Sequence, residues 1–199
     1  MGHIRHFVTD RRRFNLSTDD LILRAATAAR AGVDVIQVRE RDLPDGALAA
    51  LVRGIAGVAG GTKTRVLVND RVDVAIAAGA AGVHLRADSA PAARVRAMAP
   101  EGFLIGRSVH SLADVDAAVD GGGCDYLMFG TVFPSKGKPE GHPVAGLDGL
   151  RQACARSPLP VIAIGGMTEG RVASILEAGA AGFAAVGLFT CLTPLPQVV

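Results

Sequence analysis

Aromatic side chains are scarce in this sequence, which contains no Trp and one Tyr among its 199 residues. Proteins that bind single-stranded nucleic acids stack bases on such side chains, and a formal net charge of only +2 offers no electrostatic footprint for DNA or RNA. The sequence also lacks any run of the ~18 apolar residues that a membrane span needs. We therefore expect neither a nucleic-acid partner nor a membrane partner.

Cysteine is also rare: the chain has three, Cys124, Cys154 and Cys191, and none stands in a C-x-x-C spacing. An odd number without ligand spacing indicates reduced thiols rather than a disulfide framework or a zinc site. The N-terminal segment MGHIRHFVTDRRRF lacks the apolar core of a signal peptide. These features predict a cytoplasmic protein. A chain of 199 residues is long enough for one domain with one sizeable core, and its 49% of hydrophobic residues is a normal globular content. We therefore expect residues 1–199 to form a single domain.

A repeated pattern indicates the fold. Four segments share an Ala-rich helical stretch, a turn with Gly and a short apolar strand: AATAARAGVDVIQVRE (25–40), VAIAAGAAGVHL (74–85), VDAAVDGGGCDYLMFG (115–130) and ILEAGAAGFAAVGLF (175–189). Glycine in each turn supplies the left-handed residue that ends a helix. The turns recur every roughly 45–55 residues, which is long enough for two strand–helix units.

Further strands fit between these copies, namely IRHFVTD (4–10), RVLVND (65–70), FLIGRSV (103–109) and PVIAIGG (160–166). We predict eight strands near 4–9, 33–39, 65–69, 82–85, 103–108, 125–130, 160–164 and 183–187. Alternating strands and helices predict an α/β protein with parallel strands, and eight of them close into a compact (β/α)8 TIM barrel. An open doubly wound sheet is the rival, but no G-x-G-x-x-G follows the first strand. The C-terminal segment FTCLTPLPQVV predicts a last helix that is short or missing.

Polar residues collect where the predicted strands end, which is where such barrels carry their chemistry. Gln37 and Arg39 are two residues apart and share one face of their strand, with Ile36 and Val38 on the other face. If Ile36 and Val38 meet the helices, Gln37 and Arg39 point into the mouth of the barrel. An inward Arg39 then binds an anion, or it forms a structural ion pair with an acid from a neighbouring strand.

Glycines follow the last two strands. Gly165 and Gly166 end the seventh strand and Gly187 follows the eighth, where barrels of this kind usually bind phosphate. Backbone amides at such positions need glycine so that phosphate oxygens can approach closely. The alternative is a tight turn that requires a positive φ.

Two basic segments follow other strands. The loop PSKGKPEG (134–141) carries Lys136 and Lys138, which either deliver ammonium groups to a phosphate at the mouth or remain solvated. For the run of arginines at 11–13 we favour a solvated face. His84 lies inside an apolar strand and is expected to be a hydrogen-bonded core histidine.

Six segments in order resemble the thiamine phosphate synthase/TenI family: HFVTD, IQVRER, VNDRVDVAIAAGAAGVHL, IGRSVHSL, FGTVFPSKGKPEG and PVIAIGGMT. The resemblance covers nearly the whole chain and implies a barrel that binds phosphorylated small molecules. Synthases of the family join a pyrimidine diphosphate to a thiazole phosphate. TenI-type members isomerise a thiazole carboxylate phosphate or have no settled activity.

The synthase motif implies a site at the strand ends. It assigns the departing diphosphate to catalytic Arg39, Arg41, Lys138 and Ser108 together with Gln37 and Asn69. It assigns the thiazole phosphate to Gly165, Gly166, Val186 and Gly187, with Ser135, Lys136 and Gly137 alongside. The implied cofactor is Mg²⁺, with Asp70 as its first carboxylate ligand. The partners are these two phosphorylated substrates, and a homo-oligomer is left open.

The sequence departs from both branches. Ser89 stands at the position of the second magnesium carboxylate, so we expect the neighbouring Asp88 to take that role, and Arg86 replaces a glycine. The tautomerase pattern has an acid/base His where this chain has Thr131. His110 and His142 are expected near the mouth, and His142 is the candidate to replace that acid/base. We favour the synthase. The alternatives are a TenI-type tautomerase and a non-catalytic thiazole-phosphate binder.

Overall fold

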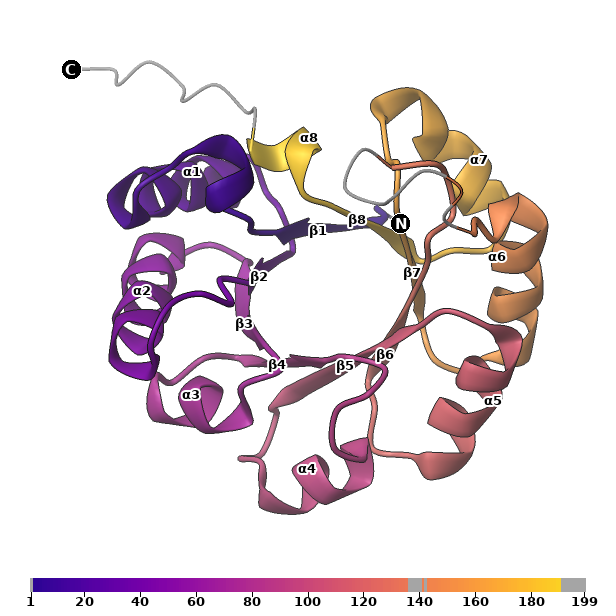
Figure 1. Ribbon diagram of the computed structural model, residues 1–199, viewed down its shortest axis with the longest axis horizontal. Coiled ribbons are helices and arrows are strands. Elements are labelled where there is room, and N and C mark those ends of the chain that lie inside the picture. The colour runs from indigo at the N-terminus through magenta and orange to yellow at the C-terminus, as the bar shows by residue number, and fades with distance from the viewer. Residues whose placement is uncertain (1, 136–140, 142, 191–199) are drawn as a thin grey trace.

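Eight parallel strands close into a barrel in the computed structural model, which describes residues 2–135, 141 and 143–190. Each strand pairs with its sequence neighbours, and β8 pairs with β1 to close the ring (Figure 1). The strands are β1 (Ile4–Val8), β2 (Val35–Val38), β3 (Arg65–Asn69), β4 (Gly82–Leu85), β5 (Leu104–Val109), β6 (Tyr126–Phe129), β7 (Val161–Ile164) and β8 (Gly182–Ala185). The predicted (β/α)8 barrel is therefore confirmed, and the open sheet was the wrong alternative.

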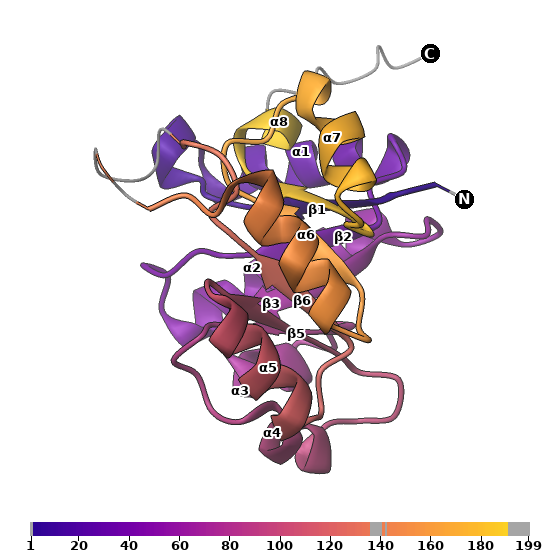
Figure 2. The same ribbon diagram turned by 90° about the vertical axis from the view of Figure 1, so that its right-hand side faces the viewer.

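The helices surround the ring of strands, as the two perpendicular views show (Figures 1 and 2). They are η1 (Arg12–Phe14), α1 (Thr18–Arg30), α2 (Asp45–Ala59), α3 (Val72–Ala77), α4 (Ala92–Met98), α5 (Leu112–Gly121), α6 (Gly146–Arg156), η2 (Glu169–Arg171), α7 (Val172–Glu177) and α8 (Gly187–Thr190). The described part of α8 has four residues, and 191–199 lie outside the described residues. In the part of the chain that the structure describes, no helix has the length and apolarity needed to cross a membrane.

Local sequence sets the ends of several helices. Ser17 and Ser111 begin α1 and α5 with capping boxes, in which each serine accepts from the backbone N–H of an aspartate three residues on and that carboxylate accepts in return. The glycines of the four predicted turns have positive φ values, +76° at Gly32, +69° at Gly79, +63° at Gly122 and +96° at Gly179. The prediction that a glycine with positive φ ends each of these helices is confirmed, although Gly122, with ψ −177°, is not in the left-handed helical conformation.

Two apolar layers hold the barrel together. Ile36 and Val38 belong to the outer layer, between the strands and the helices, whereas Leu67 and Met128 belong to a smaller cluster inside the barrel. The alternation along β2 therefore places Gln37 inside the barrel, as predicted from its spacing. This inner layer leaves room at its upper end for the polar side chains described next.

Candidate active site

A chain of hydrogen bonds crosses the inside of the barrel from β1 to β3. His6 Nε2 and Gln37 Oε1 lie 3.0 Å apart, and Gln37 Nε2 donates to Asn69 Oδ1 at 2.9 Å. Gln37 is almost fully buried, at 2% exposure. Its amide therefore holds the side chain of Asn69 in place at the end of β3. Asn69 is half-buried there and is more accessible to a substrate than Gln37 is.

His84 forms a second buried group across β4, β5 and β6. Its Nδ1 lies 2.9 Å from the Tyr126 hydroxyl, and its Nε2 lies 2.8 Å from Ser108 Oγ. Gly106 is required beside it, because a Cβ at that position would overlap the Tyr126 ring. His84 is thus the hydrogen-bonded core histidine that was predicted, and it positions the hydroxyl of Ser108 from β5.

Both interior histidines are neutral. Burial lowers the pKa of His6 and of His84 to about 3, against an ordinary value of 6.5, and the hydrogen bond of His6 to Gln37 Oε1 only partly offsets this for His6. Burial raises the pKa of the Tyr126 hydroxyl, which stays protonated. The polar side chains inside the barrel are therefore uncharged. The charged side chains of the site lie at the carboxyl ends of the strands, where the mouth of the barrel opens.

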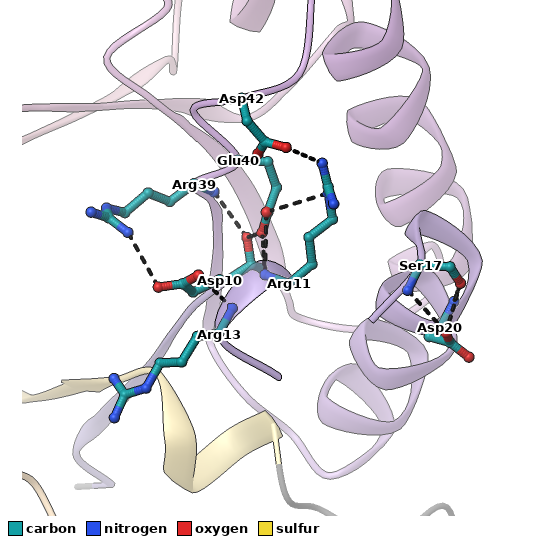
Figure 3. A network of polar contacts seen from close by, with 9 residues as sticks. Asp10, Arg11, Arg13, Ser17, Asp20, Arg39, Glu40 and Asp42 are labelled. Carbon is teal, nitrogen blue, oxygen red and sulfur yellow. Dashed lines mark hydrogen bonds and ion pairs between the residues drawn. The ribbon is translucent and has the colours of Figure 1, made fainter. Parts of the chain in front are cut away.

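The segment after β2 is anchored by a buried carboxylate (Figure 3). Thr9 Oγ1 donates to Glu40 Oε1 at 2.6 Å and accepts from the backbone N–H of Arg39 at 2.9 Å. The backbone N–H of Arg11 also donates to Glu40, at 3.1 and 3.2 Å to its two oxygens. Burial raises the pKa of Glu40, opposed by the hydrogen bonds from Thr9 and Arg11. Sequence reasoning did not single out Glu40, which reads as one charge among several in VRERD.

The side chain of Arg39 lies at the mouth beside Asp10 (Figure 3). Its Nη1 is 3.7 Å from Asp10 Oδ2, and both side chains are 30% exposed. A pair so long and so exposed contributes little stability. The structure thus contains the ion pair that was considered as an alternative, but in a loose form that leaves the guanidinium free to meet an anion.

Arg11 corrects one expectation. Only 18% of its side chain is exposed, and its guanidinium pairs with Asp42 and lies 3.7 Å from Glu40. Arg12 and Arg13 are exposed in η1, as expected for a solvated face. The prediction was wrong for Arg11 because the path of the chain after β1 turns its side chain toward a buried acid on the neighbouring strand.

Arg86 joins the two aspartates that were expected to bind magnesium. Its Nη1 lies 3.5 Å from Asp70 Oδ2, and its Nη2 pairs closely with Asp88 Oδ2. The hydroxyl of Ser89 donates to Asp70 Oδ1. Asp88 is exposed, with 69% of its side chain accessible, and it pairs with Arg86, while its role as a magnesium ligand stays a prediction.

Three arginines converge at this part of the mouth. Partial desolvation, followed by the fields of Arg39 and Arg86, lowers the pKa of Arg41, although its side chain is exposed. Arg41 makes no ion pair with any residue that the structure describes, while Asp70 and Asp88 act on it only through their fields. Like charges gathered at one point favour an anion between them.

The residues present do not fit the implied magnesium site. A magnesium ion is usually held by one or two carboxylates with open oxygens, plus phosphate oxygens and waters. Here Ser89 and Arg86 engage both oxygens of Asp70, and Asp88 holds Arg86. No cluster of three His, Cys, Asp or Glu side chains suited to a metal occurs among the residues described. Magnesium binding stays a prediction from the resemblance.

The glycines after β7 pack against the loop after β6. Gly165 has φ +103° and Gly166 has φ +62°, and a Cβ on Gly166 would overlap the backbone oxygen of Pro134. The guanidinium of Arg171 holds the carbonyl of Gly166 and lies 4.5 Å from the ring centroid of Phe133. The chain's own packing therefore requires these glycines, so their presence alone does not mark a phosphate.

Gly187 is different. It opens α8 directly after Val186, and a Cβ there would meet only Phe14, at an ordinary contact distance of 3.7 Å. Ser135 is half-buried at the end of the described loop. The remaining predicted residues of this region, Lys136, Gly137, Lys138 and His142, lie outside the described residues, as does any contact they make.

The fold is a parallel barrel whose mouth gathers guanidinium groups, an arrangement that suits an enzyme for phosphorylated small molecules. Residues 5–189 match the family described as thiamine monophosphate synthase. The chain therefore belongs to the thiamine monophosphate synthase (TMP-TENI) family, which confirms the resemblance read from its motifs.

Individual relatives agree. The chain is 41% identical over 189 residues to the thiamine-phosphate synthase of Methanoculleus marisnigri, covering 94% of this chain and 87% of the relative. It is 40% identical over 182 residues to a putative thiamine-phosphate synthase of Geobacter sulfurreducens, covering 91% and 84%. Among solved structures, thiamine phosphate pyrophosphorylase from Pyrococcus furiosus superimposes with a TM-score of 0.81 at 29% identity, covering 96% of this chain and 89% of that one. These relatives support an enzyme of the transferase class.

Proposed function

We propose that this chain is a thiamine-phosphate synthase: it joins 4-amino-5-hydroxymethyl-2-methylpyrimidine diphosphate to a thiazole phosphate and releases diphosphate. The observation that carries the proposal is the convergence of Arg39, Arg41 and Arg86 at the end of β2 and β4, where a multiply charged anion can bind. Charge-assisted contacts of this kind are the strong ones for phosphate oxygens.

The reaction needs charge stabilisation more than it needs an acid or a base. The bond between the pyrimidine methylene carbon and the diphosphate oxygen breaks, the diphosphate leaves with the electron pair, and the thiazole nitrogen forms the new C–N bond. Arg39 and Arg41 stabilise the charge that develops on the leaving group. Asn69, fixed by Gln37, and Ser108, fixed by His84, offer hydrogen bonds at known positions beside them.

The thiazole phosphate is placed on the other side of the mouth, above β7 and β8. There Gly187 has open space beside its backbone, and Gly165 and Gly166 form a rigid turn held by Arg171. This arrangement would bring the thiazole nitrogen toward the pyrimidine methylene carbon that carries the diphosphate, from the far side of the barrel axis. Lys136 and Lys138 follow β6 in the sequence and lie outside the described residues, and we propose that they too bind substrate phosphate.

A cytoplasmic location is part of the proposal. Cys124 and Cys154 carry free thiols, which is usual in a reducing compartment. The proposed substrates are phosphorylated metabolites, which a cytoplasmic enzyme can reach. Gel filtration with light scattering measures whether copies of the chain assemble into a homo-oligomer.

The test is direct product formation. We expect the purified chain, incubated with the pyrimidine diphosphate and the thiazole phosphate, to form thiamine phosphate, separated by chromatography and quantified by mass. Arg41→Met should lose most of this turnover, because Arg41 forms no ion pair with a described residue and its proposed role is to bind the diphosphate. Arg53→Met, an exposed arginine on α2, is the matched control and should keep it.

A parallel incubation with the thiazole carboxylate phosphate alone distinguishes the competing activity. Isomerisation there without any thiamine phosphate in the first incubation would overturn the synthase and support the tautomerase. Binding of the thiazole phosphate without either reaction would support the non-catalytic alternative. Thr131, at the position of the tautomerase histidine, has a hydroxyl that titrates far above neutrality, so we expect no isomerisation.

A further inference from the structure

We propose that Arg86 takes the place of a divalent cation at the diphosphate subsite, so that this chain binds diphosphate without a metal. The inference deepens the proposed function and rests on it for the identity of the substrate. It is carried by three observations: the engaged oxygens of Asp70, the position of Arg86 between two carboxylates, and the rigid loop that holds it.

Asp70 is occupied by the chain's own groups. Ser89 Oγ donates to one carboxylate oxygen, and Arg86 Nη1 lies 3.5 Å from the other. The backbone of Asp70 is also fixed, because its N–H donates to the carbonyl of His84 at 2.9 Å and its φ is +66°. A metal at this carboxylate would have to share it with a hydroxyl and a guanidinium that already lie against its two oxygens. Asp70 instead serves as the anchor of Arg86.

Arg86 directly follows β4, one strand away from Asp70 and two strands away from Arg41. Its guanidinium reaches both Asp70 and Asp88, and 42% of its side chain remains exposed at the mouth. The two carboxylates thus orient the cation without enclosing it. An arginine presents five N–H donors in a planar fork, so donors remain for phosphate oxygens after both ion pairs are made.

The loop after β4 is held from the neighbouring strand. Arg107 on β5 donates to the carbonyls of Ala87 at 2.8 Å and Ala90 at 3.0 Å. The backbone N–H of Arg86 donates to Ser89 Oγ at 2.8 Å, so the serine that meets Asp70 also closes the turn. Because Arg86 and the loop that follows it are both fixed, the guanidinium charge stays at one position. A bound metal cation likewise offers a fixed positive charge to phosphate oxygens.

Electrostatics supports the same assignment. Arg39 and Arg86 are the two cations whose fields bear most on Arg41, so the three guanidinium groups are close enough to repel one another. Asp10 and the pair Asp70 and Asp88 face Arg39 and Arg86 at the described mouth, while Arg41 forms no ion pair with a described residue. A diphosphate bound among the three would relieve this repulsion, whereas a further dication beside Arg86 would increase it.

Calorimetry with inorganic pyrophosphate tests the proposal. We expect the wild-type chain to bind pyrophosphate in excess EDTA, and excess Mg²⁺ to change the dissociation constant by less than about threefold. Arg86→Gln should weaken binding in EDTA by about 10- to 100-fold, the usual effect of losing charge-assisted contacts. Arg86→Lys should retain part of the affinity, and Arg53→Gln should retain all of it. Thermal unfolding of each variant shows that it is folded.

A double substitution tests the converse. Arg86→Gly with Ser89→Asp removes the cation and places a second carboxylate next to Asp70. We expect this variant to lose binding in EDTA and to recover it with Mg²⁺. Wild-type binding that disappears in EDTA and returns with Mg²⁺, or an Arg86→Gln variant that binds as the wild type does, would overturn the proposal.

Product formation separates this inference from the proposed function. If thiamine phosphate forms only when Mg²⁺ is added and pyrophosphate binding has the same requirement, the synthase stands and the role of Arg86 is wrong. If pyrophosphate binds in EDTA through Arg86 but no thiamine phosphate forms under any condition, the anion site stands and the synthase is wrong.

Discussion

Thr9 and Glu40 share a buried hydrogen bond of 2.6 Å that ties the end of β1 to the segment after β2. The same hydroxyl accepts from the backbone N–H of Arg39. The two residues therefore determine where the chain leaves β2 and hence where Arg39 and Arg41 begin. Glu40 is only 4% exposed, so its carboxylate does not serve as a solvated surface charge. We therefore regard Glu40 as a positioning residue for Arg39 and Arg41.

We predict that Glu40→Gln lowers the free energy of unfolding by about 1–3 kcal/mol, because the amide NH2 that replaces Oε2 cannot accept from the Arg11 backbone and sets a donor against the Arg11 guanidinium. Pyrophosphate affinity should fall as well, since the anchor of Arg39 is loosened. Chemical denaturation and calorimetry measure the two effects. The control is Asp42→Asn, which removes the exposed partner of the same Arg11 and should cost less than about 1 kcal/mol. Equal losses for both variants would contradict the positioning role.

The buried histidines predict acid sensitivity. The folded-state pKa of His6 and of His84 is lowered to about 3 from an ordinary 6.5, so between these values the unfolded chain binds more protons than the folded chain. Their contribution to stability is therefore present above pH 6.5 and is lost as the pH falls. Each histidine should contribute a slope of about 1.4 kcal/mol per pH unit in this window.

Denaturant unfolding between pH 6.5 and 5 checks this slope, in a range where carboxyl groups with ordinary pKa values contribute little. His6→Gln should be less stable at neutral pH, because Gln37 loses its partner, but its slope should be about half that of the wild type. Tyr126→Phe keeps both imidazoles and should keep the full slope. A pH-independent stability of the wild type across this range would show that the two rings are not held neutral.

Much of the fold was predictable because its signals are local. The strand expected at 33–39 is observed as Val35–Val38, and the alternation of Ile36, Gln37 and Val38 was enough to assign the outer and inner faces. Gly32 ends its helix with a positive φ, and a glycine directly after an Ala-rich helical stretch predicts this ending well. These features depend on residues within one turn or one strand.

The site was less predictable because its contacts cross between loops. Arg86 meets Asp70 at the start of a loop that Arg107 on the next strand holds, and the sequence does not show the path of that loop. Glu40 is buried through Thr9, which lies 31 positions earlier in the chain. Gly166 was read as a phosphate contact, yet its backbone already packs on Pro134. Each of these relations depends on loop geometry rather than on residue type.

Gly187 offers a clean test of the thiazole phosphate pocket. A Cβ there has room beside Phe14, so Gly187→Ala should leave stability unchanged or raise it by up to about 1 kcal/mol in the short helix α8. If phosphate oxygens approach this backbone, the methyl group should weaken thiazole phosphate binding at least about tenfold. Calorimetry and thermal unfolding report the two quantities separately.

Gly166→Ala cannot serve in its place. Its φ of +62° and the nearby Pro134 oxygen make any side chain there destabilising whether or not phosphate binds. Unchanged affinity of the folded Gly187→Ala chain for thiazole phosphate would place the pocket elsewhere on the mouth. Val186, directly before it, would then lose its assigned role too.

Arg39 separates anion binding from structural pairing. Its contact with Asp10 is 3.7 Å long, and both side chains are 30% exposed, so Arg39→Met should change the free energy of unfolding by less than about 0.5 kcal/mol. Binding of the pyrimidine diphosphate should weaken by about 2–3 kcal/mol, since a charge-assisted contact to phosphate is lost. The reciprocal variant Asp10→Asn provides the decisive control. It removes the competing carboxylate and keeps the guanidinium, so affinity should stay the same or increase. If instead Arg39→Met unfolds more easily, Asp10→Asn does the same, and both bind the diphosphate as the wild type does, then Arg39 is a structural ion-pair partner and Arg41 and Arg86 carry the anion without it.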